Sequence, residues 1–262
     1  MNEQSGFIPV NSKGPQRAVY ATMYLPESLP AKLAVAIVEP LAEEKRAAYR
    51  MLVRLARKLA EDGIAAIHFD LSGTGDSTLP HDETTFNAWV DDTIAATEEI
   101  LTSSQTKQLA LVGARGGALV AAKASIETKA QKLILVEPIL SGADFLFDLE
   151  RRQSIKNMMS GSADQSQTPK SQWDEGKSVD FGGYEFNPTL ASELSNATMA
   201  DILLHLEGTT AYHAIRVSAS KKLPPAWNIF GENASIVSDK PFWGQLDYYE
   251  SDFVIDAIRH QL

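Results

Sequence analysis

One pentapeptide of this chain has the spacing that presents a single side chain for chemistry. Gly113-Ala114-Arg115-Gly116-Gly117 follows the apolar run 109–112 directly and leads into an alanine-rich stretch. It matches Gly-x-Ser-x-Gly except at its centre. Glycines on either side permit a sharp strand-to-helix turn, because a Cβ atom there would collide with the neighbouring backbone. Arg115 is therefore the residue that we expect this elbow to present.

An arginine at the elbow cannot do the chemistry of a serine hydrolase. Such an enzyme needs a nucleophile, a histidine base after the last strand and an acid that orients the histidine. Arginine stays protonated and neither attacks a carbonyl nor accepts a proton. Residues 238–245, after the last expected strand, contain no histidine, and residues 220–222, after the strand before it, contain no carboxylate. We predict a catalytically degenerate site without a confident catalytic residue.

Two serines and two glutamates remain as alternative catalytic groups. Ser72 and Ser141 follow expected strand ends, where ligands bind in open α/β sheets, but neither has a visible base. We favour a tight turn for Ser72 and a helix cap for Ser141. The alternative function is an ester or thioester hydrolase that uses Ser141, or a water activated by Glu39 or Glu137.

The five histidines favour structural roles. His68 lies inside a buried run and should be a hydrogen-bonded core residue. His81 falls in a polar loop, and His260 falls in the last turn of a helix, where a cation complements the dipole. His205 and His213 flank a weak strand, with His213 at its start, the wrong end of the sheet for a site above the elbow.

The elbow could still bind a ligand through half of an oxyanion hole. Its donors would be the N–H groups of Gly116 and Leu41, with Arg115 beside them. Filling of the old cavity by Arg115 is the alternative. The strand order usual for this kind of sheet places Glu39 and Glu137 on either side of the elbow strand. We therefore predict that Arg115 pairs with one or both.

A buried, unpaired guanidinium would be costly, so the prediction includes two further acids. If neither flanking glutamate is the partner of Arg115, we expect Glu43 or Glu44 to take that place.

Secondary-structure elements must position these residues, and the sequence indicates them. Continuous apolar runs occur at 33–38, 64–69, 109–112 and 133–136. Such runs are typical of strands buried on both faces. Amphipathic helices over 43–62 and 84–101, and a third from 116, alternate with them, which indicates an α/β fold with a mostly parallel, doubly wound sheet. Residues 17–25 should add an antiparallel edge strand.

After residue 136 the pattern changes for about sixty residues before weaker strands at 214–219 and 234–237 and a last helix at 252–261. We interpret 139–200 as a cap inserted after the sixth strand of a single domain, 1–262. Within it we expect one amphipathic helix that includes Phe145, Leu149 and 152–159, a helix capped by Asn187, and a mobile loop over 160–180.

Several segments in the right order give the chain a family resemblance. They are PLAEE at 40–44, DLSGTGDS at 70–77, the arginine-centred elbow, EPILSG at 137–142, GYEFNP at 183–188 and PFW at 241–243. The chain resembles an α/β-hydrolase and, more narrowly, the exosortase A system-associated hydrolase 2 family. The resemblance implies the α/β-hydrolase fold and a place beside bacterial loci for exopolysaccharide synthesis and surface-protein sorting. It supplies no chemical activity.

The composition of the chain limits the kinds of molecule that it could bind. A formal net charge of -10 disfavours nucleic acid, and the absence of cysteine excludes thiolate metal sites. The Gly73-Thr74-Gly75 turn lacks the third glycine of a phosphate cradle. We expect a cytoplasmic monomer or homodimer with no membrane insertion, cofactor or metal. It would act as a binding or scaffold protein for a small acyl, carboxylate or glycan-related ligand, or as a structural dimer partner through its cap.

Overall fold

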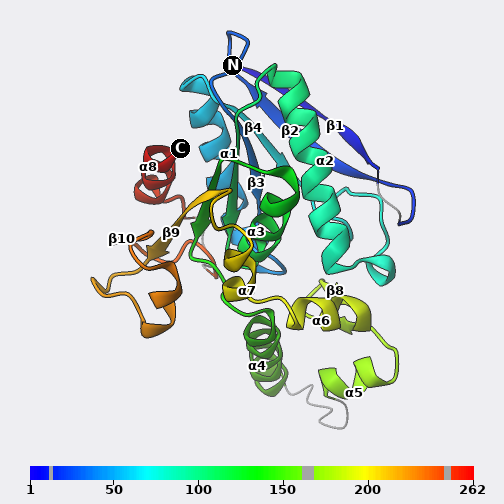
Figure 1. Cartoon of the computed structure of the whole chain (residues 1–262). Helices are drawn as coiled ribbons and strands as arrows, with labels where there is room; N and C mark the ends of the chain where they lie inside the picture. Colours follow the sequence, from blue (N-terminus) through cyan, green and yellow to red (C-terminus); the bar gives the residue numbers. More distant parts are fainter. Residues whose placement is uncertain (12–13, 161–167, 245–248) are drawn as a thin grey trace.

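The computed structural model describes residues 1–11, 14–160, 168–244 and 249–262. Their main feature is an eight-stranded sheet in the order β1-β2-β4-β3-β5-β6-β9-β10 (Figure 1). The strands from β4 to β10 run parallel, whereas β1 and β2 are antiparallel to their neighbours. The bounds are β1 (Asn2–Val10), β2 (Arg17–Leu25), β3 (Ala34–Val38), β4 (Ala65–Phe69), β5 (Leu109–Ala114), β6 (Lys132–Val136), β9 (Ala211–Val217) and β10 (Ala234–Val237).

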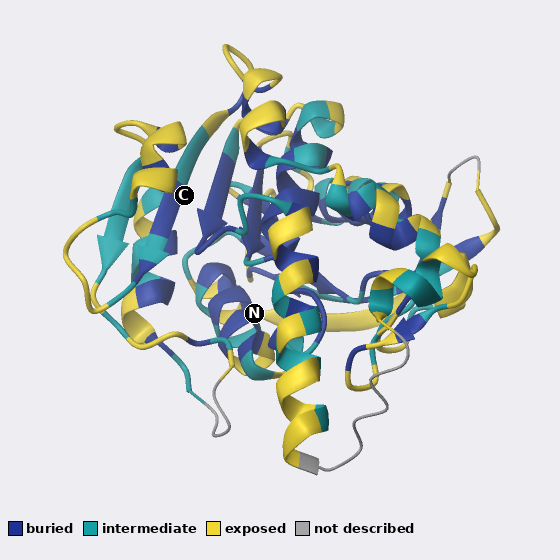
Figure 2. Ribbon diagram, turned by 90° about the horizontal axis from the view of Figure 1, so that it is seen from below, coloured by how far each residue is buried: buried dark blue, intermediate teal, exposed yellow. Residues whose placement is uncertain are grey.

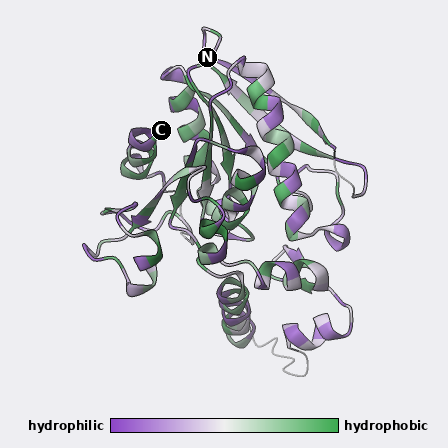
Figure 3. Ribbon diagram, in the orientation of Figure 1, coloured by the Kyte–Doolittle hydropathy of each residue, from purple (hydrophilic) through white to green (hydrophobic). Residues whose placement is uncertain are grey.

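The four predicted inner strands are confirmed as β3 to β6. Each is buried along nearly its whole length, which explains why its sequence is a continuous apolar run rather than an alternating one. These strands carry much of the apolar colour in Figure 3. The predicted edge position of β2 is wrong, because β1 pairs with its outer side. Most of β1 is exposed, its first four residues are polar, and its apolar residues are confined to the short stretch 7–10 that includes a proline, so the sequence gives only a weak strand pattern.

Helices cover both faces of the sheet. On one face, α1 (Glu44–Glu61) and α8 (Asp252–Gln261) pack into one hydrophobic cluster. On the other, α2 (Phe86–Ser104) and α3 (Gly117–Thr128) pack into a second. The Thr85 side chain accepts a hydrogen bond from the Ala88 N–H and so caps α2, as predicted. This layering leaves the carboxyl ends of the parallel strands uncovered by these four helices.

The segment between β6 and β9 lies at that end of the sheet (Figure 1). It contains α4 (Gly142–Ser160), α5 (Pro169–Asp174), α6 (Pro188–Ser195) and α7 (Met199–Leu204), with the hairpin of β7 (Val179–Asp180) and β8 (Glu185–Phe186). Two 3₁₀ helices, η1 (His81–Glu83) and η2 (Pro225–Phe230), lie elsewhere. Helix α4 buries Phe145 and Leu149, but much of its surface is exposed (Figure 2). Asn187 caps α6, as predicted.

The prediction of one mobile loop over 160–180 is wrong where the structure describes this segment. Residues 161–167 lie outside the described part of the chain, but α5 and β7 fall within the predicted loop. The indole Nε1 of Trp173 donates to the Phe186 carbonyl at 2.8 Å, and its ring packs against Phe181. One anchored tryptophan therefore orders a segment whose composition is otherwise polar.

The described residues contain neither a membrane-spanning helix nor a cluster of metal-ligating side chains. None of their helices has the length and apolar character needed to cross a bilayer. No group of three or more histidine, aspartate or glutamate side chains in the same residues is arranged to hold a metal ion.

Candidate functional site

The predicted elbow is the turn between β5 and α3, and Arg115 is its central residue. Its φ of 53° lies in the left-handed region, which costs a non-glycine residue roughly 1–2 kcal/mol. The surrounding backbone holds this conformation: the Arg115 N–H donates to the Val136 carbonyl at 3.0 Å, and the Arg115 carbonyl accepts from the N–H groups of Ala118 and Ile139. The strained residue is therefore tied to both β6 and α3.

The flanking glycines are required for the reason that the sequence indicated. A Cβ atom on Gly117 would lie 2.0 Å from the Glu39 carbonyl oxygen, and one on Gly113 would lie 2.7 Å from Ala118 Cα. Both obstacles are backbone atoms, which cannot move aside as a flexible side chain can. The close packing of α3 against the ends of β3 and β5 therefore depends on these two glycines.

The guanidinium of Arg115 is paired and stacked. Its Nε donates to Glu44 Oε2 at 3.0 Å and its Nη2 donates to Glu44 Oε1 at 3.1 Å, a fork-to-fork pair. Its Nη1 reaches the backbone carbonyl of Glu137 at 3.4 Å. The Trp243 ring centroid lies 4.4 Å from Cζ. The Arg115 side chain is 14% exposed and that of Glu44 is 1% exposed.

The predicted pairing of Arg115 with the carboxylates of Glu39 and Glu137 is wrong, and the fallback acid Glu44 is the partner. The strand order was right, since β5 lies between β3 and β6. However, Lys45 Nζ lies 2.5 Å from Glu39 Oε1 and forms an ion pair with that carboxylate. The Glu137 carboxylate accepts from Arg216 Nη1 and from the Val217 N–H, both at 2.6 Å. Donors from other elements therefore engage both flanking acids.

Glu44 also joins the elbow to the inserted segment. Arg152 of α4 lies 3.5 Å from Glu44 Oε1 and 3.1 Å from Glu43 Oε1, and Lys156 Nζ lies 2.6 Å from Glu43 Oε2. A chain of ion pairs therefore leads from Arg115 to Glu44, from Glu44 to Arg152, and from Arg152 through Glu43 to Lys156. The two acids at the start of α1 hold the elbow and α4 together.

The two residues predicted to form the oxyanion hole pack against each other. Leu41 packs against Gly116 so closely that a Cβ atom on this glycine would lie 2.8 Å from both Leu41 Cγ and Cδ1. Leu41 itself is 3% exposed. Neither Arg115 nor Gly116 lines the two cavities that border this part of the sheet. The Arg115 side chain is thus held by Glu44 and Trp243 and lines neither cavity.

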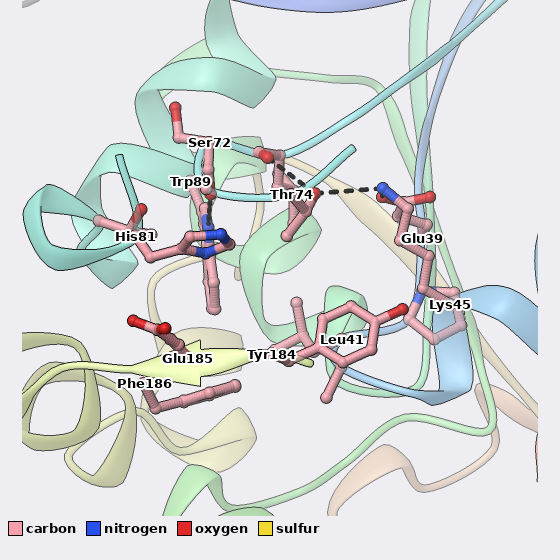
Figure 4. Close-up of a pocket in the computed structure, with 15 residues that line it drawn as sticks. Glu39, Leu41, Lys45, Ser72, Thr74, His81, Trp89, Tyr184, Glu185 and Phe186 are labelled. Atoms are coloured by element: carbon pink, nitrogen blue, oxygen red, sulfur yellow. Dashed lines mark hydrogen bonds and ion pairs between the residues drawn. The ribbon is translucent and has the colours of Figure 1, made fainter. Parts of the chain in front are cut away.

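The first of these cavities lies between the ends of β3 and β4 and the β7–β8 hairpin (Figure 4). Its volume of about 20 Å³ would hold a water molecule. At one end, Lys45 Nζ lies 2.6 Å from Asp70 Oδ1 and bonds to Thr74 Oγ1 at 3.1 Å, in addition to its contact with Glu39. Burial opposes the charge of Lys45, but Glu39 and Asp70 outweigh it and raise the pKa of the ammonium group. Lys45 is therefore a cation and not a nucleophile.

Both candidate serines have the structural roles that we favoured. Ser72 is buried in a turn closed by the hydrogen bond from the Thr74 N–H to the Leu71 carbonyl. Its side chain points away from the first cavity (Figure 4). Ser141 Oγ accepts from the Asp144 N–H at 3.3 Å and caps α4.

The histidines do not supply a base for the elbow. His68 is a core residue, as predicted, but the expected hydrogen bond is missing: its Nε2 has no hydrogen-bond partner in the described structure and lies 3.4 Å from Glu39 Oε2. His213 lies inside β9 and bonds through Nε2 to Ser235 Oγ at 2.8 Å. His81 is in η1, His205 ends α7 and His260 is in the last turn of α8.

A second cavity of about 430 Å³ lies beyond Trp243, at the ends of β6, β9 and β10. Glu137 lines it with a φ of 42°, and burial raises the pKa of its carboxyl despite Arg216 and the Val217 N–H. Sequence reasoning missed Arg216, Lys45 and the role of Trp243. An arginine inside an otherwise largely apolar strand was the available signal for Arg216.

Several solved structures are similar to this chain over nearly its whole length. Est1E from Butyrivibrio proteoclasticus, solved with ferulic acid, has a TM-score of 0.65 at 14% identity, covering 97% of this chain and 96% of that one. DcsB, solved with a substrate analogue, has a TM-score of 0.65 at 16% identity over 99% and 100%. The proline iminopeptidase-related protein TTHA1809 from Thermus thermophilus has a TM-score of 0.61 at 17% identity, covering 100% of this chain and 98% of that one.

These likenesses show the α/β-hydrolase fold alone, because the identities are low. No curated protein is similar enough in sequence to count as a match. A family model does match, over residues 34–203, which is more than half of the chain and runs from β3 into α7. The chain belongs to the family described as serine aminopeptidase, S33.

Proposed function

We propose that this protein is a catalytically degenerate α/β-hydrolase that acts as a binding or scaffold protein. One observation carries the proposal. The side chain at the nucleophile position is the Arg115 guanidinium, which is bound by Glu44 and stacked on Trp243. A cation held in this way links the sheet to α1 and α4 and cannot form an acyl-enzyme.

The other catalytic groups considered from the sequence are built into the fold, although Ser72 Oγ and Glu39 Oε2 are buried without a hydrogen-bond partner among the described residues. Ser141 Oγ caps α4, and Ser72 lies in a closed turn. The carboxylate of Glu39 lies against Lys45, and that of Glu137 accepts from Arg216 and Val217. Among the described residues no histidine hydrogen-bonds to Ser72 or Ser141, so neither hydroxyl has a base to activate it.

The ligand is part of the proposal. The resemblance to the exosortase A system-associated hydrolase 2 family supports a role beside exopolysaccharide synthesis, with a small acyl, carboxylate or glycan-related compound as ligand.

One observation favours the alternative, an ester or thioester hydrolase. Glu137 combines a raised pKa with a place on the wall of the larger cavity, as a carboxylate that activates water would. Its present hydrogen bonds to Arg216 and Val217 would have to break during turnover.

The test is direct. The purified full chain is incubated with a fluorophosphonate probe and, separately, with 4-nitrophenyl acetate, a ferulate ester and an aminoacyl 4-nitroanilide. The last two follow the ferulic acid bound to Est1E and the description of the family. We expect neither labelling nor turnover, with an active serine hydrolase as the positive control. Stoichiometric labelling of any serine would refute the proposal.

Two variants distinguish the alternative. Turnover that is lost in Glu137→Gln but kept in Ser141→Ala would establish the carboxylate-activated hydrolase. The reverse pattern would identify Ser141 as the nucleophile.

A further inference from the structure

The larger cavity, which we call the β9–β10 pocket, lies where open α/β sheets bind ligands. Its walls come from the carboxyl ends of β6, β9 and β10 and from the loops that follow the last two strands. Its volume of about 430 Å³ falls within the ~300–1,000 Å³ typical of small-molecule sites. A serine hydrolase would place its acid and its histidine in these two loops. Here they contribute small and cationic residues, such as Ser218, Ala219 and Lys240.

Both carboxylates that line the pocket are already engaged. One oxygen of Glu137 accepts from Arg216 Nη1 and the other from the Val217 N–H. The Asp239 carboxylate accepts from the hydroxyls of Tyr249 and Ser251 and from the Lys240 N–H. Burial opposes the charge of Asp239, but the hydrogen bonds from Ser251, Tyr249 and the Lys240 N–H, together with the positive charge of Lys240, outweigh it and lower the pKa of the carboxyl. Each carboxylate oxygen of the two acids thus already accepts at least one hydrogen bond.

The cations of the pocket are less fully engaged. Arg216 uses Nη1 for Glu137, its guanidinium lies 5.4 Å from the Trp227 ring centroid, and its Nε is buried without a hydrogen-bond partner. Lys240 is exposed, with Nζ 5.8 Å from the Tyr249 ring centroid. No carboxylate of the described residues lies within ion-pair distance of Lys240 Nζ. Within the described residues, Lys240 Nζ therefore has no ion-pair partner, and Nη1 is the one nitrogen of the Arg216 guanidinium that donates to a carboxylate.

The remaining wall is largely apolar. Val217, Ala219 and Pro241 line it together with Trp243, whose ring also covers the Arg115 guanidinium. Two cations beside an apolar wall suit a compound with a charged end and an apolar body. A bare inorganic anion would leave that wall unused.

We propose that the β9–β10 pocket binds a small organic carboxylate, with the carboxylate group at Arg216 and Lys240 and the apolar body against Trp243 and Pro241. This inference deepens the proposed binding function and rests on it. Arg216 and Lys240 fix the charged end, because a guanidinium and an ammonium group form short, charge-assisted hydrogen bonds to carboxylate oxygens. Trp243 joins the ligand site to the elbow, since the same ring stacks on Arg115.

Isothermal titration calorimetry tests the proposal with three probes. Phenylacetate has the required charge and apolar body, phenylacetamide has the same shape without the charge, and inorganic phosphate has charge without the body. We expect phenylacetate to bind at least tenfold more tightly than either of the others, about 1.4 kcal/mol. Equal affinity for phenylacetamide would refute the charged end, and equal affinity for phosphate would refute the apolar body. No heat from phenylacetate would refute the site.

Variants locate the binding. Lys240→Gln should weaken phenylacetate about tenfold, because one charge-assisted hydrogen bond is lost. Lys221→Gln is the matched control, because Lys221 is an exposed lysine after β9 that does not line the pocket. This variant should bind phenylacetate as tightly as the unsubstituted chain. Arg216→Lys keeps the charge near Glu137 but loses the fork and should also weaken binding. Equal affinities in Lys240→Gln, Lys221→Gln and the unsubstituted chain would overturn the assignment.

The two proposals fail separately. Fluorophosphonate labelling or ester turnover would refute the degenerate hydrolase while the titrations still locate a carboxylate. Absence of phenylacetate binding in an unlabelled, inactive protein would refute only the pocket.

Discussion

Arg115 and Glu44 form a forked pair in which Nε and Nη2 donate to the two oxygens of one carboxylate, at 3.0 and 3.1 Å. Glu44 is 1% exposed, and Arg115 retains 14% exposure under the Trp243 ring. Removal of the cation would leave a buried carboxylate with only Arg152, at 3.5 Å, as a charged partner. The pair therefore holds β5, α1 and α4 together where a hydrolase would hold its nucleophile.

Arg115→Met should lower the free energy of unfolding by about 3 kcal/mol, because Glu44 would become an almost unpaired buried charge. The double variant Arg115→Met with Glu44→Gln should lose less than the sum of the two single variants. Urea denaturation measures all three. Losses that simply add would mean that the pair contributes no coupling energy.

Arg57 and Glu3 supply the matched control for this experiment. Their side chains form the same forked arrangement, at 2.7 and 3.2 Å, but are 51% and 36% exposed. Arg57→Met should change stability by less than about 1 kcal/mol, because solvent screens an exposed pair. A loss as large as that of Arg115→Met would show that burial is not the deciding factor.

Arg115→Ser should not produce a hydrolase. The new hydroxyl would have no histidine beside it, and an unactivated serine is a poor nucleophile. We expect no burst of nitrophenol from 4-nitrophenyl acetate in stopped-flow measurements. A measurable burst would reveal a base that the described residues do not show.

Gly117→Ala should prevent stable folding or greatly lower the midpoint of thermal unfolding, since its Cβ would lie 2.0 Å from the Glu39 carbonyl oxygen. Overpacking of this kind typically costs about 1–3 kcal/mol, and here backbone must move as well. Gly6→Ala, on β1, is the control because a Cβ there has no neighbour within 4 Å. Similar melting temperatures for the two variants would contradict the close packing of α3 against β3.

His213 should make stability depend on pH. Burial lowers its pKa from the ordinary value of 6.5. Above pH 6.5 the His213 ring is neutral in both the folded and the unfolded chain, so protonation takes nothing from the free energy of unfolding. As the pH falls from 6.5 through the folded-state pKa, the unfolded chain binds the proton first and stability is lost.

His213→Gln should therefore flatten the stability curve below pH 6.5, measured by urea denaturation at a series of pH values. His260→Gln, which removes an exposed histidine, is the control. An unchanged slope in His213→Gln would show that burial does not affect this ring.

Much of the fold could be predicted because it depends on local patterns. Four apolar runs became β3 to β6, and the stripe over 43–62 became α1. The elbow followed from glycine spacing, since the backbone clashes at Gly113 and Gly117 are local steric facts. β1 was missed because this largely exposed edge strand gains its order from pairing with β2 and has only the short apolar stretch 7–10 to indicate it.

The sequence alone determined that Arg115 would stand at the elbow and would need an acid, because both follow from residue types and turn geometry. Only the tertiary structure decided which acid. Glu39 and Glu137 flank Arg115 as strand order predicted, yet Lys45 and Arg216 engage them first, while Glu44 reaches Arg115 from the start of α1. An ion pair depends on differences of a few ångströms between side chains from separate elements. Those distances exist only after the sheet, α1 and the loop carrying Trp243 have packed together.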